Sequence, residues 1–221
     1  MTRGPGLRGS GASSPGLRER KKERTRQALS DAAVALFLER GFDAVSVAEV
    51  AAAAEVSKPT LFRYFPAKED LVLHRFADHE DEAARVVAAG RRAGTAPLDA
   101  LHAHLLDGLA RRDPVTGLCD HPAVLAYLRL LYGTPALVAR LHAYRVRSEA
   151  ALADALAADA PGGAGRLVAR LAAGQIVTVL RVLADENTAR IAGGETAEAV
   201  EADAVAATEV AFRALREGLP Y

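Results

Sequence analysis

The chain has 221 residues, of which 50% are hydrophobic, 25% are charged and 5% are aromatic, and its formal net charge at pH 7 is zero. This composition allows a buried core in one or two domains, and the many Ala and Arg residues favour helices over a β-sandwich or a β-barrel. The lone Cys119 excludes an intrachain disulfide framework and predicts a cytoplasmic protein, and with no run of about 18 uncharged apolar residues we expect no membrane span.

Charge is distributed unevenly along the chain. Residues 1–75 hold 13 basic and 9 acidic side chains, whereas residues 76–221 hold 15 and 19, so the two parts carry net charges of +4 and −4. All four lysines lie in the first part. A basic end on a neutral protein indicates a polyanion as partner, although a solvated surface would give the same count.

The first predicted elements are a tail and a long helix. Residues 1–18 contain five Gly, three Ser and two Pro, a composition that predicts a disordered tail. From Glu19 onward, apolar residues recur every three or four positions. The apolar stripe through Leu29 and Phe37 predicts a helix, which Gly41 ends as a C-terminal cap.

Two short helices follow. Ser46 and Glu49 have the spacing of a capping box, in which each side chain accepts the backbone N–H of the other residue. A helix of about two turns is therefore predicted to begin there. Ser57 is a good N-cap for the next helix, Pro59 suits its first turn, and Pro66 stops it.

Six longer helices are predicted after residue 66. Short segments rich in Gly, Pro, Asp and Thr separate most of them. Their approximate spans are 68–90, 97–112, 122–132, 135–159, 164–188 and 196–217. The sequence therefore predicts an all-α protein of about nine helices, with no repeat at a fixed period.

Segment 46–65 has the layout of a helix-turn-helix, whose second helix enters the major groove of DNA. Its apolar residues are placed to pack the two helices together. Its polar residues remain on the other side, where hydroxyl and cationic groups reach base edges or phosphates: Ser57, Lys58, Thr60, Arg63 and Tyr64.

The run from Ala28 to Leu71 resembles the DNA-binding head of the tetracycline-repressor-like (TetR) family. It carries, in order and in register, Ala32-Ala33-x-x-Leu36-Phe37, Gly41-Phe42, Ser46-Val47-x-x-Val50-Ala51 and Val56-Ser57-x-x-Thr60-Leu61-Phe62-x-Tyr64-Phe65-x-x-Lys68-x-x-Leu71. The resemblance implies a three-helix DNA-binding domain over residues 19–66, and a helical ligand-binding and dimerisation domain over residues 67–221.

The resemblance also implies roles for individual residues at the DNA. Contacts with bases or nearby phosphates are expected from Ser57, Lys58, Thr60 and Arg63, and phosphate contacts from Ser46 and Tyr64. Lys68 would clamp the DNA backbone and tie the head to the second domain, and Thr25 lies in the helix-one segment expected to meet DNA. Phe62 and Phe65 are expected to pack in the core.

Four positions depart from the family pattern, Glu55, Pro59, Phe62 and Ala67, and two of these departures bear on the ends of helices. Glu55 stands where the family usually has Gly, so a left-handed backbone is not expected at the turn between the two short helices. Ala67 replaces the usual Ser or Asn before the fourth helix, which should cost about 1 kcal/mol of helix stability. Neither departure removes the head itself.

The last two helices are suited to join two copies of the chain. A dimer is expected because two recognition helices must reach half-sites roughly 34 Å apart. By resemblance, the family pairs these helices in a four-helix interface, and ordinary intrachain core remains the alternative for some of their faces. The residues expected at the interface are Leu167, Leu171, Gln175, Thr178, Val182, Val200, Ala204, Ala211, Phe212 and Leu215.

The middle helices are expected to enclose a small molecule in a largely apolar pocket. The candidates are His102, Leu105, Leu109, Tyr127, Leu131, Tyr132, His142 and Tyr144; for each leucine ordinary core packing is the favoured interpretation, and the aromatic residues and histidines are the better candidates. His102-x-His104 and Cys119-x-His121 raise the question of a metal or thiol sensor, but residues two apart on a helix do not face one another. We expect no metal and no cofactor.

These features together predict a homodimeric regulator that binds an inverted-repeat operator in double-stranded DNA. We expect a repressor that a small, largely apolar molecule releases from its operator. No Gly-rich phosphate loop, Gly-x-Ser-x-Gly elbow or His-Glu-x-x-His motif indicates an enzyme. The alternative is a helical interaction or sensor protein with a weak or vestigial DNA head.

Overall fold

The computed structural model describes residues 17–77, 79–158 and 163–218, and the described residues form helices without strands. The all-α prediction is therefore confirmed. The predicted tail lies almost wholly outside the described residues. The elements are α1 (Leu17–Arg40), α2 (Val47–Ala53), α3 (Lys58–Tyr64), α4 (Lys68–Ala77), α5 (Glu82–Arg92), α6 (Pro97–Ala110), a 3₁₀ turn η1 (Pro114–Thr116), α7 (Pro122–Gly133), α8 (Pro135–Ala157), α9 (Gly163–Ala192) and α10 (Ala197–Glu217).

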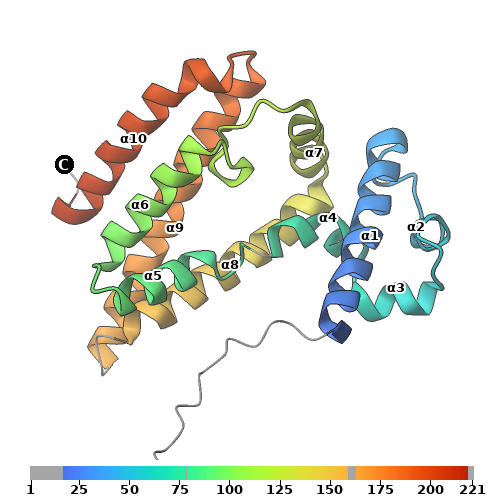
Figure 1. Ribbon diagram of the computed structural model, residues 1–221, viewed down its shortest axis with the longest axis horizontal. Helices are drawn as coiled ribbons and strands as arrows, with labels where there is room; N and C mark the ends of the chain where they lie inside the picture. Colours follow the sequence, from blue (N-terminus) through green and yellow to red (C-terminus); the bar gives the residue numbers. More distant parts are fainter. Residues whose placement is uncertain (1–16, 78, 159–162, 219–221) are drawn as a thin grey trace, which may run out of the picture.

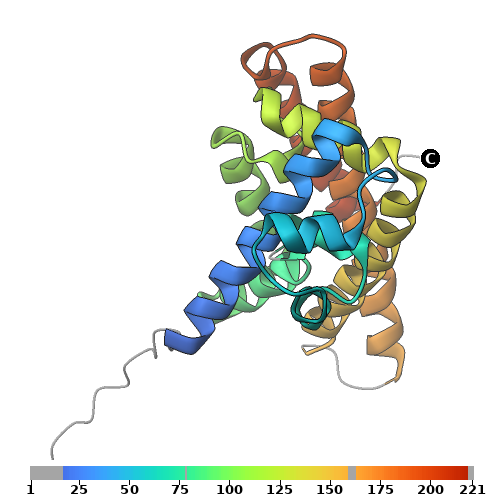
Figure 2. The ribbon, with the colours of Figure 1, turned by 90° about the vertical axis from the view of Figure 1, so that its right-hand side faces the viewer.

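The helices gather into a small head and a larger body. Figure 1 shows α1, α2 and α3 together at one end of the molecule, with α4 running from them into the body. In the body, α8 packs along α9 and α5, while α6 lies between α5 and α10. Figure 2, which views the head end, shows α1 crossing in front of the body helices.

The predicted fourth helix over 68–90 is wrong in one respect, because the structure divides it into α4 and α5. The N–H of His79 donates to the carbonyl of Phe76 and the N–H of Glu82 to that of His79, so two three-residue turns interrupt the helical ladder. At the break, the Arg147 guanidinium of α8 donates two hydrogen bonds of 2.8 and 2.9 Å to the Glu80 carboxylate. No Gly or Pro marks this break in the sequence.

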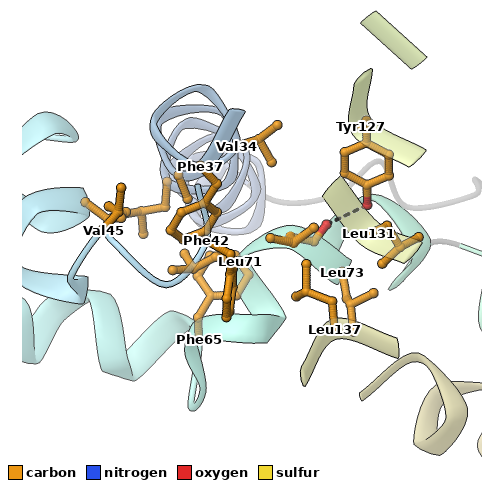
Figure 3. Close-up of a cluster of buried hydrophobic side chains, with 14 of the residues drawn as sticks. Val34, Phe37, Phe42, Val45, Phe65, Leu71, Leu73, Tyr127, Leu131 and Leu137 are labelled. Carbon is orange, nitrogen blue, oxygen red and sulfur yellow. Dashed lines mark hydrogen bonds between the residues drawn. The ribbon is translucent and has the colours of Figure 1, made fainter. Parts of the chain in front are cut away.

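A single hydrophobic cluster runs from the head into the body across α4 (Figure 3). Phe37, Phe42 and Phe65 lie on the head side, with Leu71 packed among them. Leu73 lies on the body side, close to three side chains of α7 and α8: Tyr127, Leu131 and Leu137. The domain boundary proposed between residues 66 and 67 therefore falls just before a helix that belongs to both cores.

Helix α9 carries more exposed apolar surface than the other body helices described above. By length and composition alone it could cross a membrane, a test that the core helices of soluble proteins also pass. Such a helix was not predicted, because the sequence has no run of about 18 uncharged apolar residues. Only 17% of its most apolar window is buried inside the chain, so the surface of α9 is available to a partner.

Candidate nucleic-acid interface and ligand cavity

The predicted capping box fixes the start of α2. Ser46 Oγ accepts the N–H of Glu49 at 3.2 Å, and the Glu49 carboxylate accepts the N–H of Ser46 at 2.8 Å. Arg40 lies 2.8 Å from the other oxygen of the Glu49 carboxylate. The hydrogen bonds from Ser46, reinforced by Arg40, lower the pKa of Glu49 to about 2. The last turn of α1 is thus tied to the first turn of α2.

The turn between α2 and α3 corrects the expectation for Glu55, whose φ is +54°. The N–H of Val56 donates to the carbonyl of Ala51 and the N–H of Glu55 to that of Ala52, at 2.9 and 3.1 Å. These are the two bonds of a Schellman motif, which requires a left-handed residue after the helix. The backbone bonds therefore impose the conformation on Glu55 although its β-carbon disfavours it.

Helix α3 presents its outer face to solvent. Ser57 Oγ accepts the N–H of Thr60 at 3.3 Å, as the predicted N-cap should. Ser57, Lys58 and Arg63 are exposed, while Thr60 and Tyr64 are half-buried on the flank of the helix. The cationic groups predicted to meet DNA therefore stand on the free face of α3.

The two phenylalanines of this segment, Phe62 and Phe65, differ in how deeply they are buried. Phe65 is 4% exposed and packs in the cluster of Figure 3, as predicted. The prediction that Phe62 packs in the core is wrong, since its side chain is 41% exposed. Leu61 and Phe65 already fill the inner side of α3, which turns Phe62 outward beside Lys58.

Lys68 and Thr25 make contacts inside the protein. The Lys68 ammonium donates to the carbonyl of Phe42 at 2.5 Å, and lies 4.3 Å from the Phe42 ring centroid and 5.3 Å from that of Phe37. Lys68 thus binds the first turn of α4 to the loop after α1. Thr25 Oγ1 donates to the carbonyl of Lys21 within α1.

Asp70 of α4 supplies the half of a capping box that accepts the N–H of Ala67, while Ala67 itself has no capping side chain. The Asp70 carboxylate accepts the N–H of Ala67 at 3.1 Å and also takes a bidentate pair from Arg140 of α8, at 2.8 and 3.0 Å. Asp70 lies three residues after the cap position, where an acidic side chain can reach back. That spacing was visible in the sequence, but the pairing with Arg140 was not.

Two side-chain hydroxyls hold consecutive carbonyls of α4. Ser30 of α1 donates to the carbonyl of Leu71, and Tyr127 of α7 donates to that of Val72, each at 2.8 Å (Figure 3 draws the second). Tyr127 also stacks on Phe76 of α4, with ring centroids 6.1 Å apart. The position of α4 is therefore fixed from the head by α1 and from the body by α7.

The body contains two adjoining cavities of about 190 and 170 Å³. They share His79, Asp113 and Val115, and Tyr127 lines the smaller one. η1 forms part of their wall and is locked against α9, where Asn187 donates to the carbonyl of Thr116 at 2.9 Å. Most of the lining of the larger cavity is apolar, which suits a small organic ligand.

One wall of the larger cavity is polar. Nδ1 of His79 lies 2.7 Å from one oxygen of Glu82, and Nε2 of His104 lies 3.2 Å from the other. The hydrogen bond with His79 is the main cause that lowers the pKa of Glu82, and His104 adds to it. The carboxylate is therefore charged and oriented at neutral pH, between two imidazoles.

Helix α9 carries an exposed stripe at spacings of three and four residues. The predicted interface residues Leu167, Leu171, Gln175, Thr178 and Val182 are all exposed on it. The prediction fails for Val200, Ala204 and Phe212 of α10, because they are buried in the core of their own chain. Ala211 and Leu215 are half-buried and line a groove shared with α9.

Comparison with known proteins places the head in a family. The family model described as bacterial regulatory proteins, tetR family, matches residues 29–74, from within α1 to within α4. The HTH-type transcriptional regulator TcmR of Streptomyces glaucescens is 38% identical over 136 residues, which are 61% of this chain and 58% of TcmR. The chain is thus similar to the tetR family over its head and to TcmR over 136 residues. It spans little more than half the length of TcmR in that match.

Solved structures agree with the TetR fold over most of the chain. FadR of Thermus thermophilus, a TetR-family repressor in complex with lauroyl-CoA, has a TM-score of 0.51 and 23% identity, covering 89% of this chain and 95% of that one. NalD, the secondary repressor of the MexAB-OprM multidrug efflux pump in Pseudomonas aeruginosa, has a TM-score of 0.50 and 22% identity, covering 88% and 96%. At these identities the likeness shows the fold alone.

Within the body, the predicted ligand residues are dispersed. Leu105 and Tyr127 line the two cavities. His102 instead stacks on Phe212, with ring centroids 4.8 Å apart, and its Nε2 lies 3.2 Å from Glu209. The other candidates lie in core clusters, in a polar cleft between head and body, or on the surface: Leu109 and Leu131, Tyr144, and Tyr132 with His142.

Four polar residues of the larger cavity that were not predicted as ligand residues come from a helix break and a turn. They are His79, Glu82, Arg111 and Asp113. No sequence signal identifies the first two, because no Gly or Pro marks the helix break that places them. Among the residues that the structure describes, no group of three His, Cys, Asp or Glu side chains is placed to hold a metal ion.

Proposed function

We propose that the chain is a cytoplasmic, homodimeric transcriptional repressor that binds double-stranded DNA and is released by a small molecule. The observation that carries the proposal is the free cationic face of α3, on a head that matches the tetR family model. The second helix of a helix-turn-helix enters the major groove, so Lys58 and Arg63 would meet base edges or phosphates.

The DNA contacts we propose come from three places on the head. Ser57, Lys58, Thr60, Arg63 and Tyr64 belong to α3 and its cap, and Ser46 caps α2. A capping hydroxyl accepts a backbone N–H through a lone pair and can still donate its O–H to a phosphate oxygen. We also include Thr25 of α1 and Lys68 of α4, and the bond from Lys68 to the carbonyl of Phe42 would hold its charge at the junction of the head and α4.

The partner that we propose for α9 is a second copy of the chain. Leu167, Leu171 and Val182 are each more than half exposed. Burying these side chains against the same stripe of a second copy would remove apolar surface from water and so lower the free energy of the dimer. Dimerisation would also place two copies of α3 at half-sites roughly 34 Å apart, which an inverted repeat requires.

The effector that we propose occupies the two adjoining cavities, of which the smaller is lined by Arg75 and Phe76 of α4. Their apolar lining suits a largely apolar molecule, and the charged Glu82 with its two imidazoles would orient one polar group on it. Tyr127 lines the smaller cavity and holds α4 by a hydrogen bond. A ligand that favours another position of Tyr127 would shift α4, and with it the head, toward a state with weaker operator affinity.

A selection of genomic DNA fragments retained by the purified protein tests the proposal. We expect fragments that share an inverted repeat. Arg63→Ala should weaken binding to that repeat by about 1–3 kcal/mol, whereas Arg92→Ala, an exposed site on α5, should leave the affinity unchanged. Retention of salt-sensitive background alone would favour an interaction or sensor protein with a vestigial head.

A further inference from the structure

The centre of the outward face of α3 is apolar. Pro59 and Phe62 are exposed there, between the two exposed cations Lys58 and Arg63. A phenylalanine that is 41% exposed forfeits much of the free energy that its burial would bring. Its place on the face that meets DNA suggests that binding supplies the missing apolar contact.

The local geometry keeps Phe62 on this face. Leu61, next to it, is fully buried and fills the inner side of the helix with Phe65. The Lys58 ammonium lies 5.9 Å from the Phe62 ring centroid, four residues away on the same face. The ring is thus presented outward before any DNA is bound.

We propose that Phe62, with Pro59 beside it, recognises the 5-methyl group of a thymine in each half-site of the operator. This inference rests on the proposed function. A phenyl ring has no hydrogen-bond donor or acceptor, so it cannot read the polar edges of bases or grip a phosphate. The thymine methyl is the one apolar group that the major groove displays, and Phe is among the side chains that contact it.

The flanking cations complete the prediction for the half-site. Lys58 and Arg63 carry donors that suit guanine O6 and N7, or phosphates next to the thymine. In each half-site, the apolar contact of Phe62 would therefore lie between the polar contacts of Lys58 and Arg63. A half-site read in this way holds at least one thymine whose methyl group contributes to affinity.

The test uses the full-length protein and the duplex that it selects from a random library. Each thymine is replaced in turn by deoxyuridine in both half-sites, which removes the methyl group and leaves base pairing unchanged. We expect affinity to fall about fourfold for each methyl lost at the recognised position, and about tenfold or more for the symmetric pair. Other thymines should tolerate the replacement.

The variants locate the effect at Phe62. Phe62→Ala should bind the thymine and deoxyuridine duplexes equally, while Leu38→Ala, an exposed apolar residue of α1, should keep the wild-type preference. Thermal melting of each variant checks that the head remains folded. If Phe62→Ala retains the preference, or if wild-type protein tolerates deoxyuridine everywhere, the inference is wrong while the proposed function stands. Failure to select any duplex would overturn both.

Discussion

Individual residues of the head are held in conformations that their own chemistry does not favour. Glu55 is the clearest case, because a Schellman closure forces a β-carbon into the left-handed region. The resulting backbone strain lies in the turn that joins α2 and α3. This conformation was not predicted, because it depends on two backbone hydrogen bonds that outweigh the preference of the side chain.

Replacing Glu55 by glycine should therefore stabilise the protein. We expect Glu55→Gly to raise the free energy of unfolding by about 1 kcal/mol, because glycine adopts this φ without strain. Urea titration followed by circular dichroism measures the change. Ala52→Gly, at an exposed position within α2, should lower the free energy of unfolding by a similar amount. A destabilised Glu55→Gly protein would show that the side chain has another role.

The capping box gives the head a defined response to acid. The pKa of Glu49 is about 2 in the folded protein, below its ordinary value of 4.5, so its contribution to stability is complete above pH 4.5 and is lost as the pH falls toward 2. An NMR titration of the Glu49 carboxyl should show this low midpoint. The Glu49→Gln variant should lose that part of the pH dependence. A midpoint near 4.5 would mean that the bonds to Ser46 and Arg40 do not persist in solution.

At the scale of elements, α4 is the helix on which head and body meet. Most helix ends were predictable within a few residues, because Pro, Gly and capping side chains mark them. The break before Glu82 was not, because it depends on side-chain bonds between distant residues such as Glu80 and Arg147. The cavity residues were missed for the same reason: a cavity wall is a property of packing between helices.

Removing one hydroxyl should loosen α4. Tyr127→Phe keeps the ring stacked on Phe76 but loses the bond to the carbonyl of Val72, at a cost of about 1 kcal/mol. Hydrogen exchange of the α4 amides should become faster, and thermal unfolding should begin earlier. Tyr132→Phe, at a residue that is 45% exposed, should change neither measurement. Unchanged exchange in Tyr127→Phe would remove this residue from the proposed coupling.

At the scale of the whole molecule, the exposed apolar stripe of α9 determines the expected assembly. Burying a carboxylate against its own symmetry mate is costly, so Leu171→Glu should convert a dimer into a monomer of 23.2 kDa. Light scattering after size-exclusion chromatography reads the mass directly. Leu38→Glu, also at an exposed leucine but on the head, should remain dimeric. A wild-type monomer at all concentrations would contradict the proposed interface.

The hydrophobic cluster that crosses α4 also bears on how this protein can be recombined with others. A fragment that ends at Pro66 would leave Phe37 and Phe65 without Leu71, so the three head helices should not fold as an independent module. A chimera that exchanges DNA specificity must therefore carry α4 together with the surface of α7 that receives it. The segment to exchange is therefore the head together with α4 and the surface of α7 that contacts α4. Helix α3 cannot be exchanged without them.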